Sequence, residues 1–282
     1  MMDVIYQVME SILPFSWIQY DFMKNALLAV LLITPLFGMI GTMVVDHKLA
    51  FFSDALGHSA LTGIAIGVLL GVAEPMVAMT IFAVIFAILL AQIKRSKVSS
   101  SDTIISVFSS TAIALGLVLL SAGGKFSQYS NYLIGDILTI RPQELLILVA
   151  VLVAGIVFWL LFFNKLLILS VNSVLAKSRG IRVRFVETAF ITLIAILVTV
   201  SIKWVGILII NSLLILPAAA SRNISHNVRQ YNGVAVLFSM VSGVAGLIIS
   251  YYAGTAAGPT IVLVGAAIFF LTFAFKQSVR KS

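Results

Sequence analysis

Long apolar runs separated by short polar stretches fill almost the whole chain. A run of about 20 apolar residues is long enough to cross a bilayer as a helix. The pattern therefore predicts an all-α polytopic membrane protein with nine transmembrane helices, or eight if one run does not cross. The expected spans are residues 22–45, 49–72, 76–93, 103–122, 143–163, 185–203, 204–221, 233–252 and 259–276.

Two segments have an apolar pattern that is too short or too mixed to span. Residues 1–20 are amphipathic and carry Trp17 and Tyr20, aromatic residues that favour the membrane surface, so we expect an interfacial lead-in. Residues 127–141 are too apolar for a free loop and too short to cross, which predicts a short re-entrant or interfacial helix. Residues 21–276 then form a single transmembrane domain.

The distribution of basic residues predicts the orientation of the chain. Cytoplasmic loops collect Lys and Arg, and fourteen of the 18 such residues fall on one side of the nine-span arrangement. The other four are Lys24, Lys125, Arg141 and Lys203. We therefore expect the N-terminus outside, the C-terminus inside, and residues 277–282 as a cytoplasmic tail.

The composition supports a membrane protein and excludes other classes. Of the 282 residues, 61% are hydrophobic and 10% are charged, whereas a water-soluble domain has an apolar share of about 45–50%. The formal net charge of +8 reflects the excess of Lys and Arg in the expected cytoplasmic loops, so it does not indicate a nucleic-acid partner. Because the chain has no cysteine, disulfides and thiolate metal sites are excluded.

An acid and an imidazole lie four residues apart inside the second expected span. Asp54 and His58 occupy positions i and i+4, which share one face of a helix. Carboxylate oxygen and imidazole nitrogen are common ligands of divalent zinc or manganese. A charge at the membrane centre costs about 2.5–3.5 kcal/mol on insertion scales, so such residues usually face a cavity, a partner or a substrate path. The alternative interpretation is that the two side chains only pair with each other.

Three glycines follow in the same run, at Gly63, Gly67 and Gly71. Small residues spaced by four form a strip along one helix face and allow a second membrane helix to approach closely. We therefore expect these glycines to serve helix packing.

Three further polar residues are candidates for the path or its gates: Asp136, Asn211 and Ser212. Asp136 either assists an entry gate or caps the start of a helix, and its position favours capping. Asn211 and Ser212 precede Pro217, which removes a helical hydrogen bond and can free carbonyl groups to line a path. Asn211 can instead bond a neighbouring helix, and the sequence leaves both interpretations open.

The longest inner loop, residues 169–184, contains a short amphipathic helix. Ser173 to Lys177 form a helical turn that Gly180 stops, and Arg182 and Arg184 follow. The length of the loop and this helix fit a docking element for a cytoplasmic partner.

Motifs that hold nucleotides or catalyse hydrolysis are missing from the sequence. The stretch at 123–126 lacks the spacing and the hydroxyl residue of a P-loop, so the chain does not hydrolyse ATP alone. His-Glu-x-x-His and Gly-x-Ser-x-Gly patterns are also absent. We therefore expect a membrane subunit that is not itself an enzyme.

Four stretches carry a combined pattern that is specific only when they occur together: Phe52–Ser59, Tyr132–Leu138, Val205–Ala219 and Ala257–Thr260. With these stretches the chain resembles the membrane permease subunits of bacterial ABC importers for zinc, manganese or ferrous iron. The resemblance extends from about Tyr20 to Phe275.

The resemblance implies a permease of the bacterial cytoplasmic membrane that acts as a homodimer. Its implied partners are two cytoplasmic ATPase subunits, which use ATP, and an extracytoplasmic metal-binding protein. No permanently bound cofactor is expected, and the cargo is a divalent metal. Zinc is favoured over manganese because residues 19–26 resemble zinc-type relatives.

The resemblance also assigns roles to individual residues. Asp54 and His58 match residues at the metal path of the family. The coupling helix, which contacts the ATPase, matches Ser173, Val174, Leu175, Ala176, Lys177, Gly180 and Ile181. Two positions depart from the family pattern and affect the expected ATPase contact: Asp46-His47-Lys48 replaces a basic pair, and Asn172-Ser173 replaces a frequent Asp-Pro.

The favoured mechanism is alternating access, in which Asp54 and His58 receive the ion transiently and ATP binding to the partner switches the dimer. Weak coordination by two ligands per protomer suits passage. One alternative is an ion-coupled secondary carrier in which the pair relays protons. Another is an intramembrane metallohydrolase with the pair as zinc ligands, although no motif supplies a third ligand or a general base.

Overall fold

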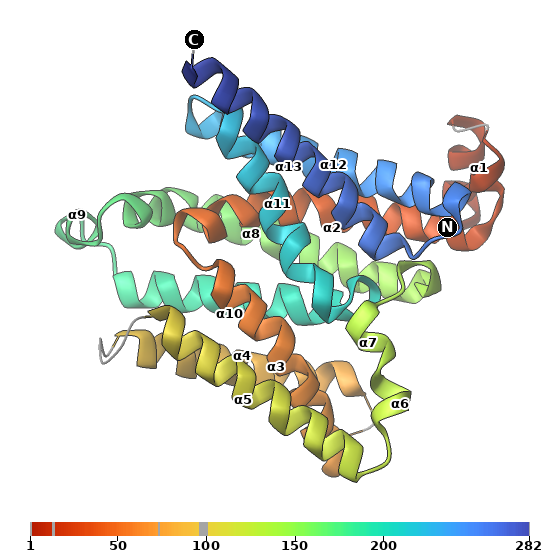
Figure 1. The fold of residues 1–282 in the computed structure, drawn as a ribbon, viewed down its shortest axis with the longest axis horizontal. Coiled ribbons are helices and arrows are strands. Elements are labelled where there is room, and N and C mark those ends of the chain that lie inside the picture. Colours follow the sequence, from red (N-terminus) through yellow and green to blue (C-terminus); the bar gives the residue numbers. More distant parts are fainter. Residues whose placement is uncertain (1, 13–14, 73, 96–100, 282) are drawn as a thin grey trace. The chain divides into compact units, whose positions relative to one another are not determined.

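A computed structural model describes residues 2–12, 15–72, 74–95 and 101–281, and every regular element in these ranges is a helix (Figure 1). Within these described ranges, eight helices are long and apolar enough to cross a membrane. They are α2 (Asp21–Asp46), α3 (Ala50–Leu69), α4 (Pro75–Arg95), α5 (Ser101–Ala122), α8 (Pro142–Val171), α10 (Val183–Val205), α12 (Val228–Ala253) and α13 (Ala257–Lys281). The prediction of an all-α polytopic membrane protein is confirmed.

The seventh expected span, residues 204–221, and the break before it differ from the prediction. The helix at this position, α11 (Ile207–Ile224), is a shorter apolar helix. The break falls at Gly206 and not at residues 203–204, because α10 continues through Val205. Gly206 has a φ of 92° and a ψ of 148°, a conformation that is essentially restricted to glycine. The chain therefore breaks its helix at the position where a glycine permits it.

Six short elements connect or precede the long helices. They are α1 (Met2–Ile12), η1 (Ser16–Gln19), α6 (Phe126–Tyr129), α7 (Asn131–Ile134), η2 (Ile137–Thr139) and α9 (Ser173–Ser178). The single short helix expected at 127–141 is thus divided into three pieces. The tail expected at 277–282 continues helix α13 through Lys281.

The helices form two compact units. The first unit comprises Met1–Thr42, Asp136–Ile156 and Ser212–Ser282, and the second comprises Met43–Gly135 and Val157–Asn211. Helices α2, α8 and α11 each contribute residues to both units, so the chain passes from one unit to the other within continuous helices.

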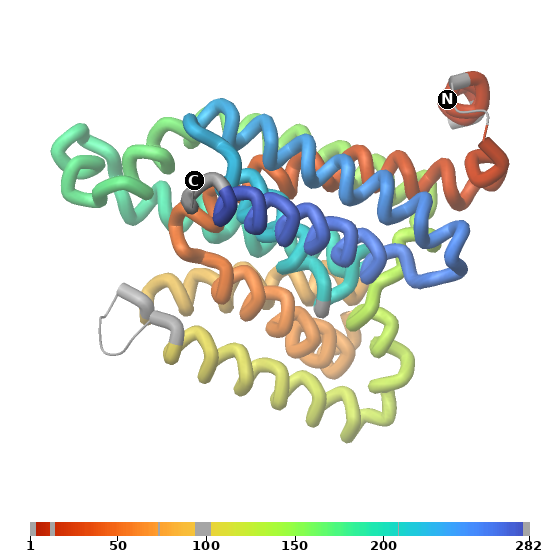
Figure 2. The backbone as a smooth tube through the Cα atoms, turned by 45° about the horizontal axis from the view of Figure 1, so that its top comes forward, coloured from red at the N-terminus to blue at the C-terminus, as the bar shows by residue number. Residues whose placement is uncertain are grey.

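Helix α3 is the most enclosed helix of the second unit and contacts α4, α5 and α10. Figure 2 shows α3 (orange) and α5 (yellow) side by side. A Cβ added to Gly63 would lie 2.8 Å from the Cα of Met79, and one added to Gly67 would overlap Ala78. These two glycines therefore provide the close helix contact expected of them, and the neighbouring helix is α4.

Gly71 has a different role from the packing role expected of it. An added Cβ there would meet no atom within 4 Å, and its φ is 69°. Its N–H bonds to the carbonyl of Val68, while the N–H of Val72 bonds to the carbonyl of Gly67. This pair of bonds is a Schellman motif, so Gly71 ends α3 and does not pack against a second helix.

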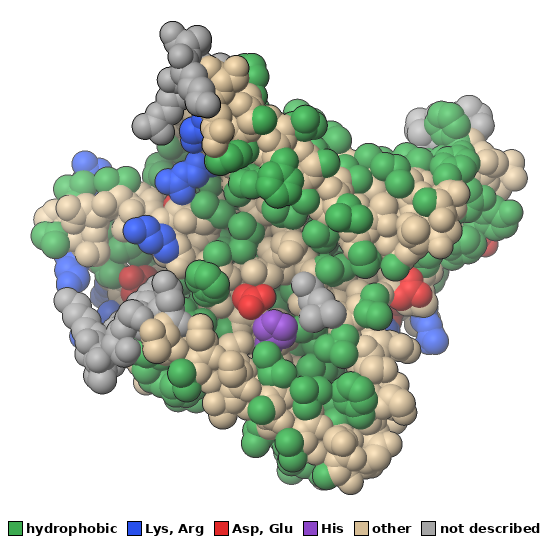
Figure 3. Space-filling view, viewed as in Figure 1, with side chains coloured by type: hydrophobic (Ala, Val, Ile, Leu, Met, Phe, Trp, Pro, Cys, Tyr) green, Lys and Arg blue, Asp and Glu red, His purple; other side chains and the backbone are tan. Residues whose placement is uncertain are grey.

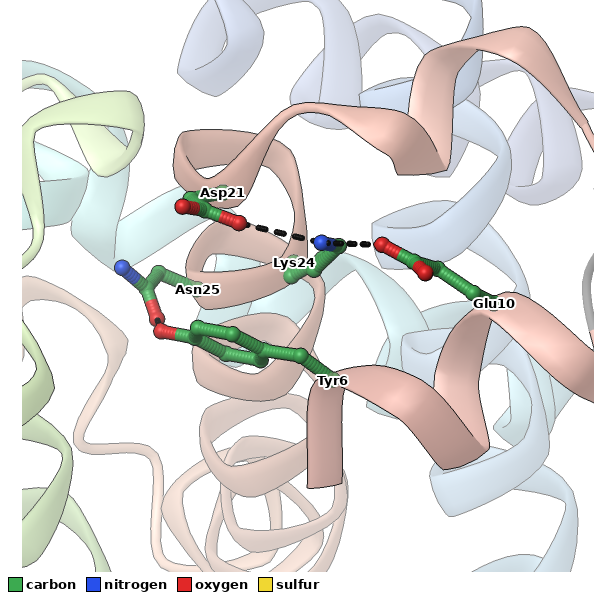
Figure 4. A network of polar contacts seen from close by, with 5 residues as sticks. All are labelled: Tyr6, Glu10, Asp21, Lys24 and Asn25. Carbon is green, nitrogen blue, oxygen red and sulfur yellow. Dashed lines mark hydrogen bonds and ion pairs between the residues drawn. The ribbon is translucent and has the colours of Figure 1, made fainter. Parts of the chain in front are cut away.

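A buried cation ties α1 to α2 in the first unit (Figure 4). The Lys24 ammonium lies 2.5 Å from a carboxylate oxygen of Glu10 and 3.0 Å from one of Asp21, and its side chain is 4% exposed. Next to it, the Tyr6 hydroxyl donates a hydrogen bond to Oδ1 of Asn25 at 2.5 Å. Polar contacts therefore attach α1 of the lead-in to the first long helix.

Candidate metal path on helix α3

Asp54 and His58, here called the Asp–His pair, lie on one edge of α3. Oδ2 of Asp54 is 3.6 Å from Nε2 of His58, and the two side chains are 43% and 22% exposed, respectively. Residues 55–57 between them are buried. Figure 3 shows a histidine and an acidic side chain next to each other among hydrophobic side chains. The helix therefore buries its apolar residues and leaves this polar pair accessible.

The separation of the pair is suitable for shared coordination of one ion. At 3.6 Å the two atoms are farther apart than a normal hydrogen bond. Two donors that each lie about 2.1 Å from a tetrahedral zinc are roughly 3.4 Å apart. Among the described residues, the structure gives Asp54 and His58 no other hydrogen bond or ion pair, so their donor atoms are not committed elsewhere.

The pair is incomplete as a permanent metal site within one chain. In the ranges that the structure describes, His, Asp and Glu side chains form no cluster of three that could hold a metal ion. Structural zinc sites almost always have four ligands, and catalytic sites have three. The pair can therefore contribute two ligands to an ion that also needs water or a second molecule.

Helix α11 meets α3 directly beside the pair. The Ser53 hydroxyl lies 2.5 Å from Oδ1 of Asn211 and 2.9 Å from the carbonyl of Ala50. One turn along α3, a Cβ added to Gly57 would lie 3.5 Å from the carbonyl oxygen of Ile207, an ordinary contact distance. Asn211 thus bonds a neighbouring helix, which is one of the two interpretations that the sequence left open, and the partner residue immediately precedes Asp54.

Asp136 caps a short helix, as its position favoured. Its side chain accepts a hydrogen bond from the N–H of Leu138 at 3.0 Å, at the start of η2. Asp136 and Ser212 both belong to the first unit, whereas the Asp–His pair and Asn211 belong to the second. The structure therefore brings together Asp54, His58 and Asn211 from the candidate set.

The residues expected to form a coupling helix lie in and directly after α9. Asn172 accepts hydrogen bonds from the N–H groups of Val174 and Leu175 at 2.8 and 3.2 Å, so it caps the helix in place of the frequent Asp-Pro. Gly180, with a φ of 74°, ends the helix, and Ile181 bonds back to the carbonyl of Ala176. The predicted turn and its stop are confirmed.

Sequence reasoning missed a contact that fixes the break between α10 and α11. Gly135, with a φ of 70°, lies so close to Gly206 that a Cβ on either residue would overlap the backbone of the other segment. Both glycines lie within the matched stretches Tyr132–Leu138 and Val205–Ala219. The sequence shows only that each stretch contains a glycine. It does not show that the two glycines meet.

The part of the chain that the structure describes combines helices long and apolar enough to cross a membrane with an accessible Asp–His pair on one of them. Residues 19–276 match the ABC 3 transport family, and the chain belongs to this family. It is an ABC transporter permease subunit and a multi-pass membrane protein, as predicted.

Individual relatives cover nearly the whole chain. The high-affinity zinc uptake system membrane protein ZnuB of Haemophilus influenzae is 32% identical over 92% of this chain and 98% of its own length. The manganese transport system membrane protein MntC of Listeria innocua is 31% identical over 91% of each chain. The structure of PsaBC from Streptococcus pneumoniae in complex with Fab has a TM-score of 0.81 at 27% identity, covering 96% of this chain and 95% of that one.

The bond between Ser53 and Asn211 predicts an energetic coupling between α3 and α11. We expect Asn211→Ala and Ser53→Ala each to lower thermal stability in detergent, and the double variant to be no worse than Asn211→Ala alone. The coupling free energy should be about 0.6 kcal/mol, within a limit of about 1.7 kcal/mol for hydrogen bonds between membrane helices. Additive effects in this double-mutant cycle would show that the two side chains do not interact.

Proposed function

We propose that this chain is the permease through which an ATP-driven importer moves a divalent metal ion, zinc in the first place and manganese in the second. The observation that carries the proposal is the Asp–His pair, whose donor atoms are 3.6 Å apart and accessible on a helix that is otherwise mostly buried. The names of relatives that transport zinc or manganese support this class of cargo.

The chemistry of the pair suits an ion in transit. One carboxylate and one imidazole accept both zinc and manganese, since imidazole suits zinc and carboxylate suits manganese. Two ligands from one chain hold an ion weakly, and a homodimer would supply four. Binding that is favourable enough for entry and weak enough for release is what conduction requires.

The exposed apolar residues of α9 and the distribution of Lys and Arg support an ATPase subunit and an extracytoplasmic binding protein as the partners. We place the N-terminus outside and α9 in the cytoplasm, because most Lys and Arg residues then face inward. Val174 and Leu175 on α9 are 71% and 42% exposed. Exposed apolar residues on a capped, rigid turn suit insertion into a groove of an ATPase subunit. An extracytoplasmic binding protein would deliver the ion to the opposite side.

The first test is metal content in a strain that lacks zinc and manganese uptake, complemented with this chain and its ATPase and binding protein. Asp54→Asn and His58→Gln should each lower the gain in cell zinc or manganese at least tenfold, because each removes one of two ligands, at an unchanged membrane level of the chain. Glu74→Gln and His226→Gln, which change exposed residues that are not part of the pair, should leave uptake intact.

The metal that accumulates with the wild-type chain identifies the cargo. A gain in cell zinc supports zinc as the cargo. A gain in manganese alone makes manganese the cargo and leaves the assignment of the Asp–His pair to the metal path unchanged. Normal uptake of both metals by the two pair variants would contradict the assignment of the path.

The second test concerns the ATPase contact. Val174→Asp should weaken co-purification of the ATPase by roughly tenfold, which corresponds to about 1.4 kcal/mol, because it places a charge in an apolar contact. Val228→Asp is the matched control, since Val228 is 40% exposed at the start of α12. Equal retention of the ATPase by both variants would exclude Val174 from the interface.

A further inference from the structure

A basic cleft lies beside α9, where α8 ends and α10 begins. Its volume is about 420 Å³, and its lining includes three cations, Lys165, Arg179 and Arg182. The apolar part of the lining comes from Ile181, Phe185 and Val186. None of the residues that line this cleft is an Asp or Glu. The cleft therefore combines positive charge with an apolar wall.

The three cations have no acidic partner among the residues that the structure describes. Among the described residues, the structure gives Lys165, Arg179 and Arg182 no ion pair. The Lys165 ammonium lies 5.0 Å from the centre of the Phe162 ring, and the rings of Phe162 and Phe185 are 6.1 Å apart. Like charges that share a cleft repel each other, so an anion bound between them would be stabilised. The arginine forks in particular match the oxygens of a phosphate group.

The position of the cleft along the helices suggests where this anion comes from. Helix α8 has 30 residues, or about 45 Å, whereas the hydrocarbon core of a bilayer is about 30 Å thick. Lys165 lies about 35 Å along this helix from its first residue, just beyond the length that the hydrocarbon covers. Phe185, in the first turn of α10, is 62% exposed. If the hydrocarbon begins at the first residue of α8, Lys165 lies at the level of the lipid headgroups, close to the exposed ring of Phe185.

We propose that this cleft binds the phosphate headgroup of an anionic membrane phospholipid, with an acyl chain against Phe162 and Phe185. Basic pockets between membrane helices are known to recognise lipid headgroups in this way. A lipid in this cleft joins the end of α8 to the start of α10, and so stabilises the base of α9. This site is independent of the metal path, because the Asp–His pair contributes nothing to its lining.

The test is native mass spectrometry of the purified full-length chain with phosphatidylglycerol or phosphatidylcholine. The wild-type chain should retain phosphatidylglycerol and not phosphatidylcholine, and Arg179→Gln combined with Arg182→Gln should weaken retention at least tenfold. The matched control is Arg229→Gln combined with Lys276→Gln, which removes the same charge from exposed positions outside the cleft and should bind like wild type. Equal retention by all three proteins would overturn the proposal.

Two further measurements keep the test decisive. If the double arginine variant does not fold, Lys165→Gln alone should still lower retention of phosphatidylglycerol, and unchanged retention would overturn the proposal. Inorganic phosphate at millimolar concentration should not displace the lipid, because it makes no contact with the aromatic wall. Complete displacement would show that the cleft takes a soluble anion, and would likewise overturn the lipid assignment.

Discussion

The free-energy cost of placing ionisable groups within an apolar span is the physical constraint on which this permease depends. A carboxylate or imidazole within a bilayer is tolerated only where water, a partner or a substrate reaches it. Helix α3 meets this constraint by burying the residues around Asp54 and His58 and leaving the two side chains accessible. Accessibility of two ligands on a fixed helix is what a path for a divalent ion requires.

Helix packing fixes the position of the Asp–His pair. Gly63 and Gly67 bring the backbone of α4 into contact with α3, and Ser53 bonds to Asn211 of α11. In membranes, where lipid is as apolar as the helix surfaces, such close contacts and hydrogen bonds hold helices together. The same helix α11 begins directly after Gly206, which is fixed by its contact with Gly135. The position of the pair therefore depends on residues outside the pair itself.

Much of this could be predicted from the sequence because each signal was local. Apolar run length indicated the spans, spacing by four indicated the Asp–His pair, and Gly180 indicated the end of α9. The predictions failed where a local pattern has two structural outcomes. Gly71 continues the glycine spacing, yet the helix ends two residues before it, and the residues at 203–204 are polar and aromatic, yet helical. The Ser53–Asn211 bond joins residues far apart in the chain, and the basic cleft brings Lys165 of α8 together with Arg179 and Arg182, which follow α9. A single sequence reveals neither contact.

The most direct measurement is the chemical accessibility of position 58. Because the chain has no cysteine, His58→Cys introduces a single thiol, and its alkylation by a water-soluble reagent can be followed in membranes. The account predicts alkylation at 58, little at a control Ser59→Cys whose position is fully buried, and protection by zinc that is lost when Asp54→Asn is added. Absence of alkylation at position 58 in every nucleotide state of the importer, or zinc protection that is independent of Asp54, would contradict the assignment of the pair to the metal path.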